Sequence, residues 1–170
     1  PAKEVSLCGH ATLATAHVLF EHQGYLGRRV TFHSRSGPLM VERKSDWYYM
    51  NFPVDLPTLV PTPKVIDAAL QLHPVETYKG KEDYLIILDS QEAVERVQPD
   101  FHRLRQLDGR GLIVTAAGRS TDIASRCFYP KYGVDEDPVT GSAHTTLGPY
   151  WANRLGKNAL TAVQCSPRRG

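Results

Sequence analysis

The sequence predicts an α+β protein built from two similar parts, and three observations lead to that class. An apolar helical pattern near the start is followed by three strand-like stretches with no helix between them, which is typical of α+β folds. A motif at residues 4–20 returns at residues 136–151. A proline-rich segment at residues 54–63 separates the two copies.

The two copies of the motif align without gaps and place an acidic residue before a turn that closes on Gly-X-Ala. We interpret them as one architectural unit that is used twice. The aligned pairs are Glu4 with Glu136, Cys8 with Thr140, Gly9 with Gly141, His10 with Ser142, and Ala11 with Ala143.

The first part, residues 1–53, is expected to be a partial N-terminal domain. Its helix at residues 9–22 carries apolar side chains around most of its circumference, so we expect it to be buried on nearly all sides. Gly24 supplies the stop signal of this helix. Strands rich in β-branched and aromatic residues are predicted at 28–34, 38–43 and 46–52, with a hairpin turn at 44–46.

The segment 54–63 is predicted to be a linker. Prolines at 53, 57, 61 and 63 exclude a helix interior or a central strand and favour a stiff, extended connector. We therefore place the domain boundary here.

The second part, residues 64–170, is expected to be a partial C-terminal domain. Ser90 and Asp100 are candidate N-caps, and Pro149 should kink the last helix or mark a transition in it. Helices are predicted at 63–72, 90–97, 99–107 and 142–156. Strands are predicted at 83–89, 110–118, 121–130 and 159–165, with a loop at 131–141.

Composition excludes several classes of partner. A formal net charge of +2 is too small to indicate a nucleic-acid footprint, and no apolar run approaches the ~20 residues of a membrane span. Three widely spaced cysteines favour a reducing compartment over a disulfide scaffold. The sequence therefore predicts a cytoplasmic protein with neither a nucleic-acid nor a membrane partner.

Cofactor sites are not predicted either. The sequence has no Cys-X-X-Cys or His-Glu-X-X-His pattern for zinc, and no glycine-rich phosphate-binding loop for a nucleotide. A serine nucleophile would need a Gly-X-Ser-X-Gly elbow, which the stretch around Ser142 lacks. We expect no metal and no cofactor.

Both motifs place a glycine, Gly9 or Gly141, at the entrance of an apolar helix. The first N–H groups of a helix have no internal partner, and together with the helix dipole they favour an anion such as a carboxylate. A single motif of this kind is more simply a well-formed helix start. The duplication shifts the interpretation toward a binding site.

Four side chains at these entrances carry candidate chemistry, each with a structural alternative. His10 suits proton transfer because its reference pKa is about 6.5, and Asp137 suits binding an amine or orienting an acid. Ser142 suits contact with a substrate carboxylate. All three alternatively stabilise helix ends. Cys8 is either a thiolate base at a helix start or a small buried hydrophobe.

The stretches "EVSLCGHATLA", "ASRCFYPKYGVDEDPVTGSAHTTLGPYW" and "CSPRRG" resemble hallmarks of the PhzF-like (phenazine biosynthesis-like) family, relatives of diaminopimelate epimerase. The resemblance covers essentially the whole chain. It implies a diaminopimelate epimerase-like fold of two pseudo-symmetric domains, each a β-sheet wrapped around a central helix. It also implies that both domains are truncated in this sequence.

The resemblance further implies a cofactor-independent isomerase that moves a proton within a small carboxylate-bearing substrate, and a homodimer. The family's catalytic glutamate is expected upstream, in a Ser-Glu-Thr-like segment. His10 and Asp137 carry over as catalytic residues, and Gly9, Gly141 and Ser142 as substrate-binding residues. The alternative is an inactive scaffold that serves as an interaction protein.

A third hypothesis is a thiol-dependent epimerase. Racemisation by two thiols needs a cysteine on each face of the reacting carbon, and here Cys8 is aligned with Thr140. An unactivated hydroxyl is a poor base near neutral pH. The pairing therefore argues against this mechanism.

Overall fold

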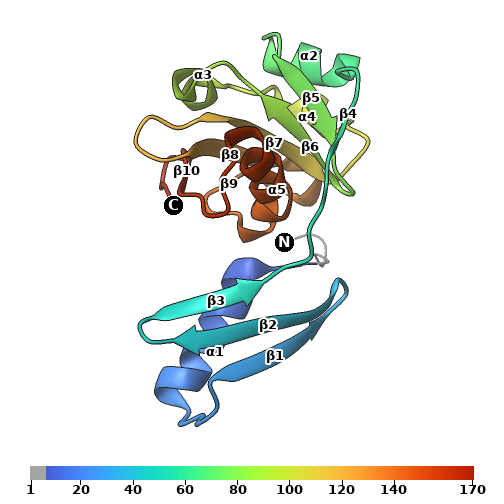
Figure 1. The fold of residues 1–170 in the computed structure, drawn as a ribbon. Helices are drawn as coiled ribbons and strands as arrows, with labels where there is room; N and C mark the ends of the chain where they lie inside the picture. The colour runs from blue at the N-terminus through green and yellow to red at the C-terminus, as the bar shows by residue number, and fades with distance from the viewer. Residues whose placement is uncertain (1–6) are drawn as a thin grey trace. The chain divides into compact units, whose positions relative to one another are not determined.

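A computed structural model describes residues 7–170. Contacts divide the chain into two compact units, one ending at Val54 and the other beginning at Asp55 (Figure 1). Each unit has its own sheet. Glu4, the first residue of the aligned motif, lies outside the described residues.

The first unit consists of one helix and an antiparallel sheet in the order β1-β2-β3. The helix and all three strands were predicted, and Gly24 adopts the left-handed conformation (φ +64°) that ends the helix. The turn at Ser45–Asp46 joins Lys44 to its partner Trp47. The elements are α1 (Gly9–His22), β1 (Arg29–Ser34), β2 (Gly37–Lys44) and β3 (Trp47–Asn51).

The core of the first unit is small. Ala16 and Phe20 of α1 are buried together with Val41 of β2. The expectation that α1 is buried on nearly all sides is wrong, because Ala14 and Val18 are exposed. The sheet of this unit contacts one side of the helix, so the apolar residues of the other side stay accessible.

The proline-rich segment is extended and contributes β4 (Thr58–Leu59). This strand lies at the edge of the second sheet, paired with β5 (Glu76–Lys79), where prolines on either side do not interrupt a ladder. Neither strand was predicted. Both are short, and neither shows the clear apolar alternation of a longer strand.

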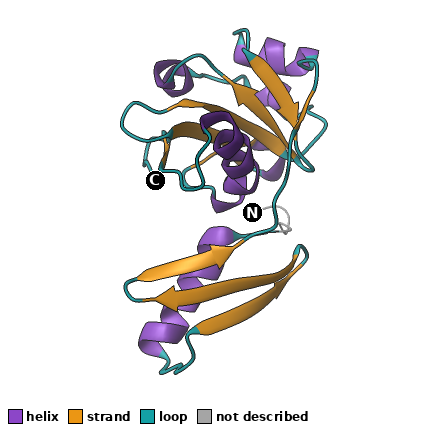
Figure 2. Cartoon of the chain, in the orientation of Figure 1, coloured by secondary structure: helices purple, strands orange, loops and turns teal. Residues whose placement is uncertain are grey.

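The second unit is built on a seven-stranded sheet, whose strands are orange in Figure 2. The strand order is β10-β8-β7-β6-β5-β4, with β9 paired to β8. Two neighbouring pairs, β6·β7 and β8·β10, are parallel and the other pairs are antiparallel. The remaining strands are β6 (Asp83–Ile87), β7 (Gly111–Ala117), β8 (Ile123–Tyr129), β9 (Val134–Asp137) and β10 (Ala162–Gln164).

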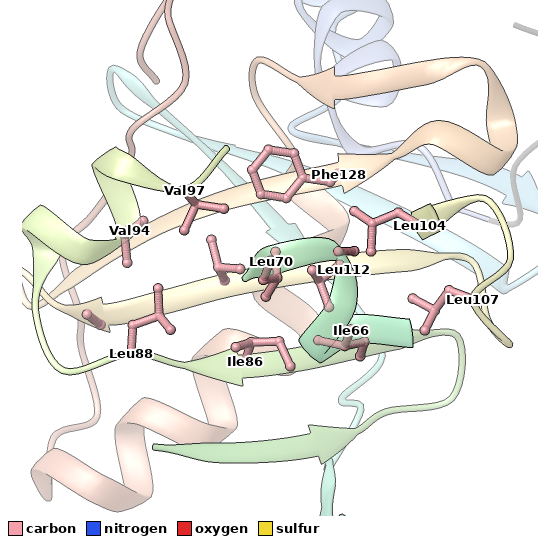
Figure 3. Close-up of a cluster of buried hydrophobic side chains, with 13 residues drawn as sticks. Ile66, Leu70, Ile86, Leu88, Val94, Val97, Leu104, Leu107, Leu112 and Phe128 are labelled. Atoms are coloured by element: carbon pink, nitrogen blue, oxygen red, sulfur yellow. The ribbon is translucent and has the colours of Figure 1, made fainter. Parts of the chain in front are cut away.

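Three helices pack on one face of this sheet: α2 (Lys64–Leu70), α3 (Gln91–Arg96) and α4 (Phe101–Leu104). Figure 3 shows their side chains, such as Ile66, Val94 and Leu104, in one cluster with Ile86, Leu112 and Phe128 of the strands. Both predicted caps are present. Ser90 Oγ accepts from the Ala93 N–H at 3.2 Å, and Asp100 Oδ1 accepts from the Arg103 N–H at 3.1 Å.

The opposite face is covered by α5 (His144–Leu155), which continues directly from the 3₁₀ helix η2 (Gly141–Ala143). Leu147 and Trp151 pack there against Leu85, Ile113 and Cys127. Successive strand residues point to opposite faces, which is why neighbours along one strand belong to different clusters.

Pro149 lies inside α5 and changes its hydrogen bonding. A proline has no N–H, so the carbonyl of Thr145, four residues earlier, loses its donor within the helix. The Asp55 N–H donates to this carbonyl at 3.0 Å. The Asp55 carboxylate also accepts from the Lys81 N–H at 3.0 Å. The start of the second unit is thereby fixed to α5.

None of the helices described between residues 7 and 170 combines the length and apolar character that crossing a membrane requires.

Candidate functional site

The second motif lies between β9 and α5. The sequence predicted a loop at 131–141, and this is wrong in part, because η1 (Pro130–Tyr132) and β9 occupy its first half. β9 has the sequence Val-Asp-Glu-Asp, and its three acidic residues are atypical of a strand, which is why the sequence did not predict it. It pairs with β8 so that Asp137 lies opposite Cys127. This pairing sets the direction in which the loop 138–140 leaves the sheet.

Asp137 is the last residue of β9 and is half-buried. Its Oδ2 accepts a hydrogen bond from Thr140 Oγ1 at 2.7 Å. The capping alternative requires a backbone N–H of the following helix as its partner, whereas this partner is a side-chain hydroxyl. The carboxylate is therefore fixed within its own loop.

Gln164 of β10 fixes the same loop from the adjoining strand. Its side-chain Oε1 accepts from the Thr140 N–H at 2.7 Å, while Nε2 donates to the carbonyl of Asp137. Gln164 and Thr140 are both buried. The sequence reasoning assigned Gln164 no role, although a polar side chain near the end of a predicted strand was a signal that it has a specific partner.

The "CSPRRG" segment closes over the loop from the same side. Ser166 Oγ donates to the Pro138 carbonyl at 2.8 Å, and Gln164 N–H donates to the Gly170 carbonyl at 2.8 Å. A Cβ atom on Gly170 would lie 2.5 Å from Val139 Cγ2, so a larger residue here would require the Val139 side chain to move. The second and third of the three stretches quoted for the resemblance thus form one substructure.

Ser142 lies in η2, half-buried, and its hydroxyl faces a buried ion pair. Arg110 Nη2 donates to Ser142 Oγ at 3.4 Å, and Arg110 Nε donates to Asp83 Oδ1 at 2.9 Å. Burial alone would lower the pKa of Arg110, but the hydrogen bonds and charge of Asp83 more than offset it and raise that pKa. Neither Arg110 nor Asp83 was singled out from the sequence.

Beside this pair, β8 carries a thiol and a phenol. Burial raises the pKa of the Cys127 thiol to about 12. The Tyr129 hydroxyl is buried and makes no hydrogen bond within residues 7–170. A thiol with so high a pKa is a poor nucleophile near neutral pH, so Cys127 does not support thiol chemistry here.

The first motif forms the start of α1. Gly9 is buried at the first helical position, and His10 is exposed. Cys8 Sγ lies 3.7 Å from His10 Nε2, and Thr12 Oγ1 donates to the Cys8 carbonyl at 2.7 Å. The structure therefore gathers Gly9 and His10 with Cys8 at one helix start, and Asp137, Gly141 and Ser142 at the other.

The two helix starts match in backbone conformation. The aligned residues Cys8 (φ −129°, ψ 99°) and Thr140 (φ −115°, ψ 87°) are both extended, and neither start has a side-chain cap. They differ in that the second helix begins with a 3₁₀ turn. Among residues 7–170 no side chain caps the first N–H groups of either helix, so these groups can donate to a ligand with acceptor oxygens.

No group of three histidine, cysteine, aspartate or glutamate side chains within the described part of the chain is placed to hold a metal ion. The donors at these helix starts are hydroxyl and N–H groups, which suit an anion rather than a cation.

Comparisons with known proteins agree with the family resemblance seen in the sequence. A model of the phenazine biosynthesis-like protein family, PhzC-PhzF, matches residues 1–169. The chain is 51% identical over its whole length to an uncharacterised isomerase of Pseudomonas aeruginosa, covering 65% of that protein. It is 38% identical to phenazine biosynthesis-like domain-containing protein 2 of Mus musculus, covering all of this chain and 66% of that protein.

A solved structure of a PhzF-family phenazine biosynthesis protein from Enterococcus faecalis superposes with a TM-score of 0.91 at 47% identity. All of this chain and 65% of that one are covered. This chain thus spans about two thirds of the length of the proteins it resembles. Sequence and structure both show that the chain belongs to the phenazine biosynthesis-like (PhzF) family and has its diaminopimelate epimerase-like fold.

Proposed function

We propose that this protein is an isomerase that moves a proton on a carbon atom of a small carboxylate-bearing substrate, without a cofactor. The observation that carries the proposal is the pair of matched, uncapped helix starts at Gly9 and Gly141, each followed by a polar side chain. The names of two relatives, from Pseudomonas aeruginosa and Halalkalibacterium halodurans, describe isomerases.

The proposed roles follow from the donors and acceptors at each helix start. The N–H groups of Gly141 and Ser142 and the Ser142 hydroxyl are donors, so they bind the substrate carboxylate. Asp137 keeps Oδ2 on Thr140, which leaves Oδ1 to accept a hydrogen bond from an amine or hydroxyl of the substrate. His10 is exposed at its helix start and takes part in proton transfer.

The general base of the proposed reaction is a glutamate, in the upstream segment that the family resemblance implies. It removes the proton from carbon and returns it at a second position of the same substrate, so no electrons leave the molecule. His10 and Asp137 hold the substrate in place and share in moving the proton.

The test is a deuterium wash-in screen with the full-length protein over amino acids and hydroxy acids in deuterated water. We expect deuterium at a carbon-bound position of one substrate class, detected by mass spectrometry. His10→Ala and Asp137→Ala should slow incorporation by about 10²-fold or more, as loss of proton-transfer groups usually does.

Cys8→Ser is the matched control, because it changes the same helix start and should leave the rate close to wild type. A rate abolished by Cys8→Ser would instead support a thiol-dependent epimerase. Full-rate exchange in both alanine variants would remove His10 and Asp137 from the site. No exchange with any acid would favour an interaction protein that kept the scaffold.

A further inference from the structure

The proline-rich segment after the first unit is bonded to the second unit along most of its length. The Asp55 N–H donates to the Thr145 carbonyl of α5 at 3.0 Å, and the Val60 N–H donates to the Thr77 carbonyl of β5 at 2.9 Å. β4 lies between these two bonds and pairs with β5. Thr62 Oγ1 lies 2.7 Å from Thr77 Oγ1. From Asp55 onward, the segment is therefore attached to the second unit.

The Asp55 carboxylate adds a second set of bonds to its backbone bond. It accepts from the Lys81 N–H at 3.0 Å and from Thr146 Oγ1 at 3.3 Å. A Cβ atom on Gly80 would lie 2.5 Å from Asp55 Oδ2, so the carboxylate packs closely against the backbone there. Asp55 is thus held on two sides, by α5 and by the turn between β5 and β6.

The three residues before Asp55 lack such bonds. Phe52, Pro53 and Val54 make no backbone hydrogen bond to another residue of the stretch 7–170. β3 ends just before them, at Asn51, and the Val54 side chain is 61% exposed. Contacts also divide the chain between Val54 and Asp55. The chain therefore passes from one unit to the other through three residues that neither sheet holds.

Pro53 limits the rotations that are open to this stretch. The ring fixes φ of a proline at about −65° and restricts the preceding residue, here Phe52, to extended conformations. The remaining rotations, which break no hydrogen bond, are ψ of Pro53 and φ and ψ of Val54. Hinges of domain movements are a few residues at the ends of elements that absorb rotations of this kind.

We propose that the two units reorient relative to one another about Pro53 and Val54, and that Asp55 is the anchor at which this hinge ends. Units joined by a short stretch reorient by default unless a large apolar interface holds them. The anchor depends on Pro149, because the Thr145 carbonyl lacks a donor within α5. The hinge is thereby attached to the helix that follows the candidate site.

The test uses residual dipolar couplings of the ¹⁵N-labelled chain in a dilute aligned medium, which report how each N–H vector is averaged by motion. We expect the couplings of the two units to give alignment tensors of different magnitude. The couplings of Asp55, Thr58 and Val60 should fit the tensor of the second unit. The coupling of Val54 should fit neither tensor.

Variants test the hinge and the anchor separately. Val54→Pro fixes φ of residue 54 and restricts ψ of Pro53, so the difference in tensor magnitude should fall by about half, whereas Val54→Ala should leave it unchanged. Asp55→Ala removes the bonds of the carboxylate, so the couplings of residues 55 and 56 should no longer fit the second tensor. Asp46→Ala, at an exposed position of the β2–β3 turn, is its control.

Several outcomes would overturn the proposal. Tensors of equal magnitude and rhombicity would show that the two units move as one body. Couplings of residues 55–63 that fit neither tensor would extend the hinge over the whole proline-rich segment. An unchanged tensor difference in Val54→Pro, or unchanged couplings in Asp55→Ala, would remove Val54 as the hinge or Asp55 as the anchor. The proposed isomerase activity is tested separately, by deuterium exchange.

Discussion

Arg126 joins three parts of the second unit through one side chain. Its Nη1 donates to the carbonyls of Val94 and Val97 at 3.2 and 2.7 Å, at the end of α3. Its Nε and Nη2 donate to the carboxylate of Glu136 at 2.7 and 2.9 Å. The guanidinium satisfies helix-end carbonyls that would otherwise lack donors, and it fixes β9, which leads into Asp137.

Arg126→Met is expected to destabilise the protein by about 3–5 kcal/mol, because it leaves the carboxylate of Glu136, whose side chain is only 16% exposed, without its partner. Arg119→Met is the matched control. Arg119 also bonds acidic residues of α3 but is 57% exposed, compared with 8% for Arg126, so its loss should change stability by less than about 1 kcal/mol. Urea unfolding followed by circular dichroism measures both, and equal effects would contradict the assignment.

At the scale of elements, β10 and the turn after it support the loop that carries the candidate site. Gln164 is the central contact, since its one amide group bonds both ends of the loop, at Asp137 and at Thr140. A parallel strand pair with β8 places it there, more than twenty residues away along the chain.

Gln164→Leu keeps the approximate volume and removes both hydrogen bonds. We expect a loss of stability of about 1–3 kcal/mol, because the buried Thr140 N–H is left unpaired. The amide of Thr140 should also exchange faster with deuterated water, which NMR measures directly. Gln106 is exposed, so Gln106→Leu should change neither quantity. A Thr140 amide that still exchanges slowly in Gln164→Leu would show that Gln164 is not the residue that fixes this loop.

The long elements of this protein were predictable because their apolar side chains form patterns typical of buried strands and helices. The apolar stretches of β6, β7 and β8 and the helix at Gly9–His22 were all expected at nearly their observed positions. The strands β5 and β9 were not, since Glu-Thr-Tyr-Lys and Val-Asp-Glu-Asp lack an apolar pattern and pair only because a neighbouring strand is present.

The candidate site divides in the same way. Gly9, His10, Asp137, Gly141 and Ser142 stand out because a short motif repeats them or surrounds them. Asp83, Arg110 and Gln164 come from other strands, and only the pairing of β6, β7 and β10 with their neighbours places them beside the motif. Strand pairings between distant parts of the chain cannot be predicted from local sequence patterns, so these three residues could not be assigned to the site.

Over the whole molecule, the two units differ greatly in the size of their cores. The buried apolar cluster of the first consists of three residues, Ala16, Phe20 and Val41. The second has separate clusters on both faces of its sheet, one of them with thirteen buried residues. Because buried apolar area is the main stabilising contribution to folding, their stabilities should differ in the same order.

Native-state hydrogen exchange in low concentrations of urea should therefore show α1 and β1–β3 opening before β6–β8. Mass spectrometry of peptides from residues 9–51 and 84–128 measures the two openings in one experiment. Exchange of both sets of peptides at the same urea concentration would show instead that the protein unfolds as a single cooperative unit.

Pro149 sets a limit on how this protein tolerates engineering. Replacing a proline within a helix by alanine is a routine route to higher thermal tolerance, because it restores a missing bond of the helix. Here the restored N–H would compete with Asp55 for the Thr145 carbonyl. The variant would gain a more regular helix and weaken one of two bonds between Asp55 and α5, the other being the bond from Thr146 Oγ1 to the Asp55 carboxylate, so a higher melting temperature would come with a looser attachment of that segment.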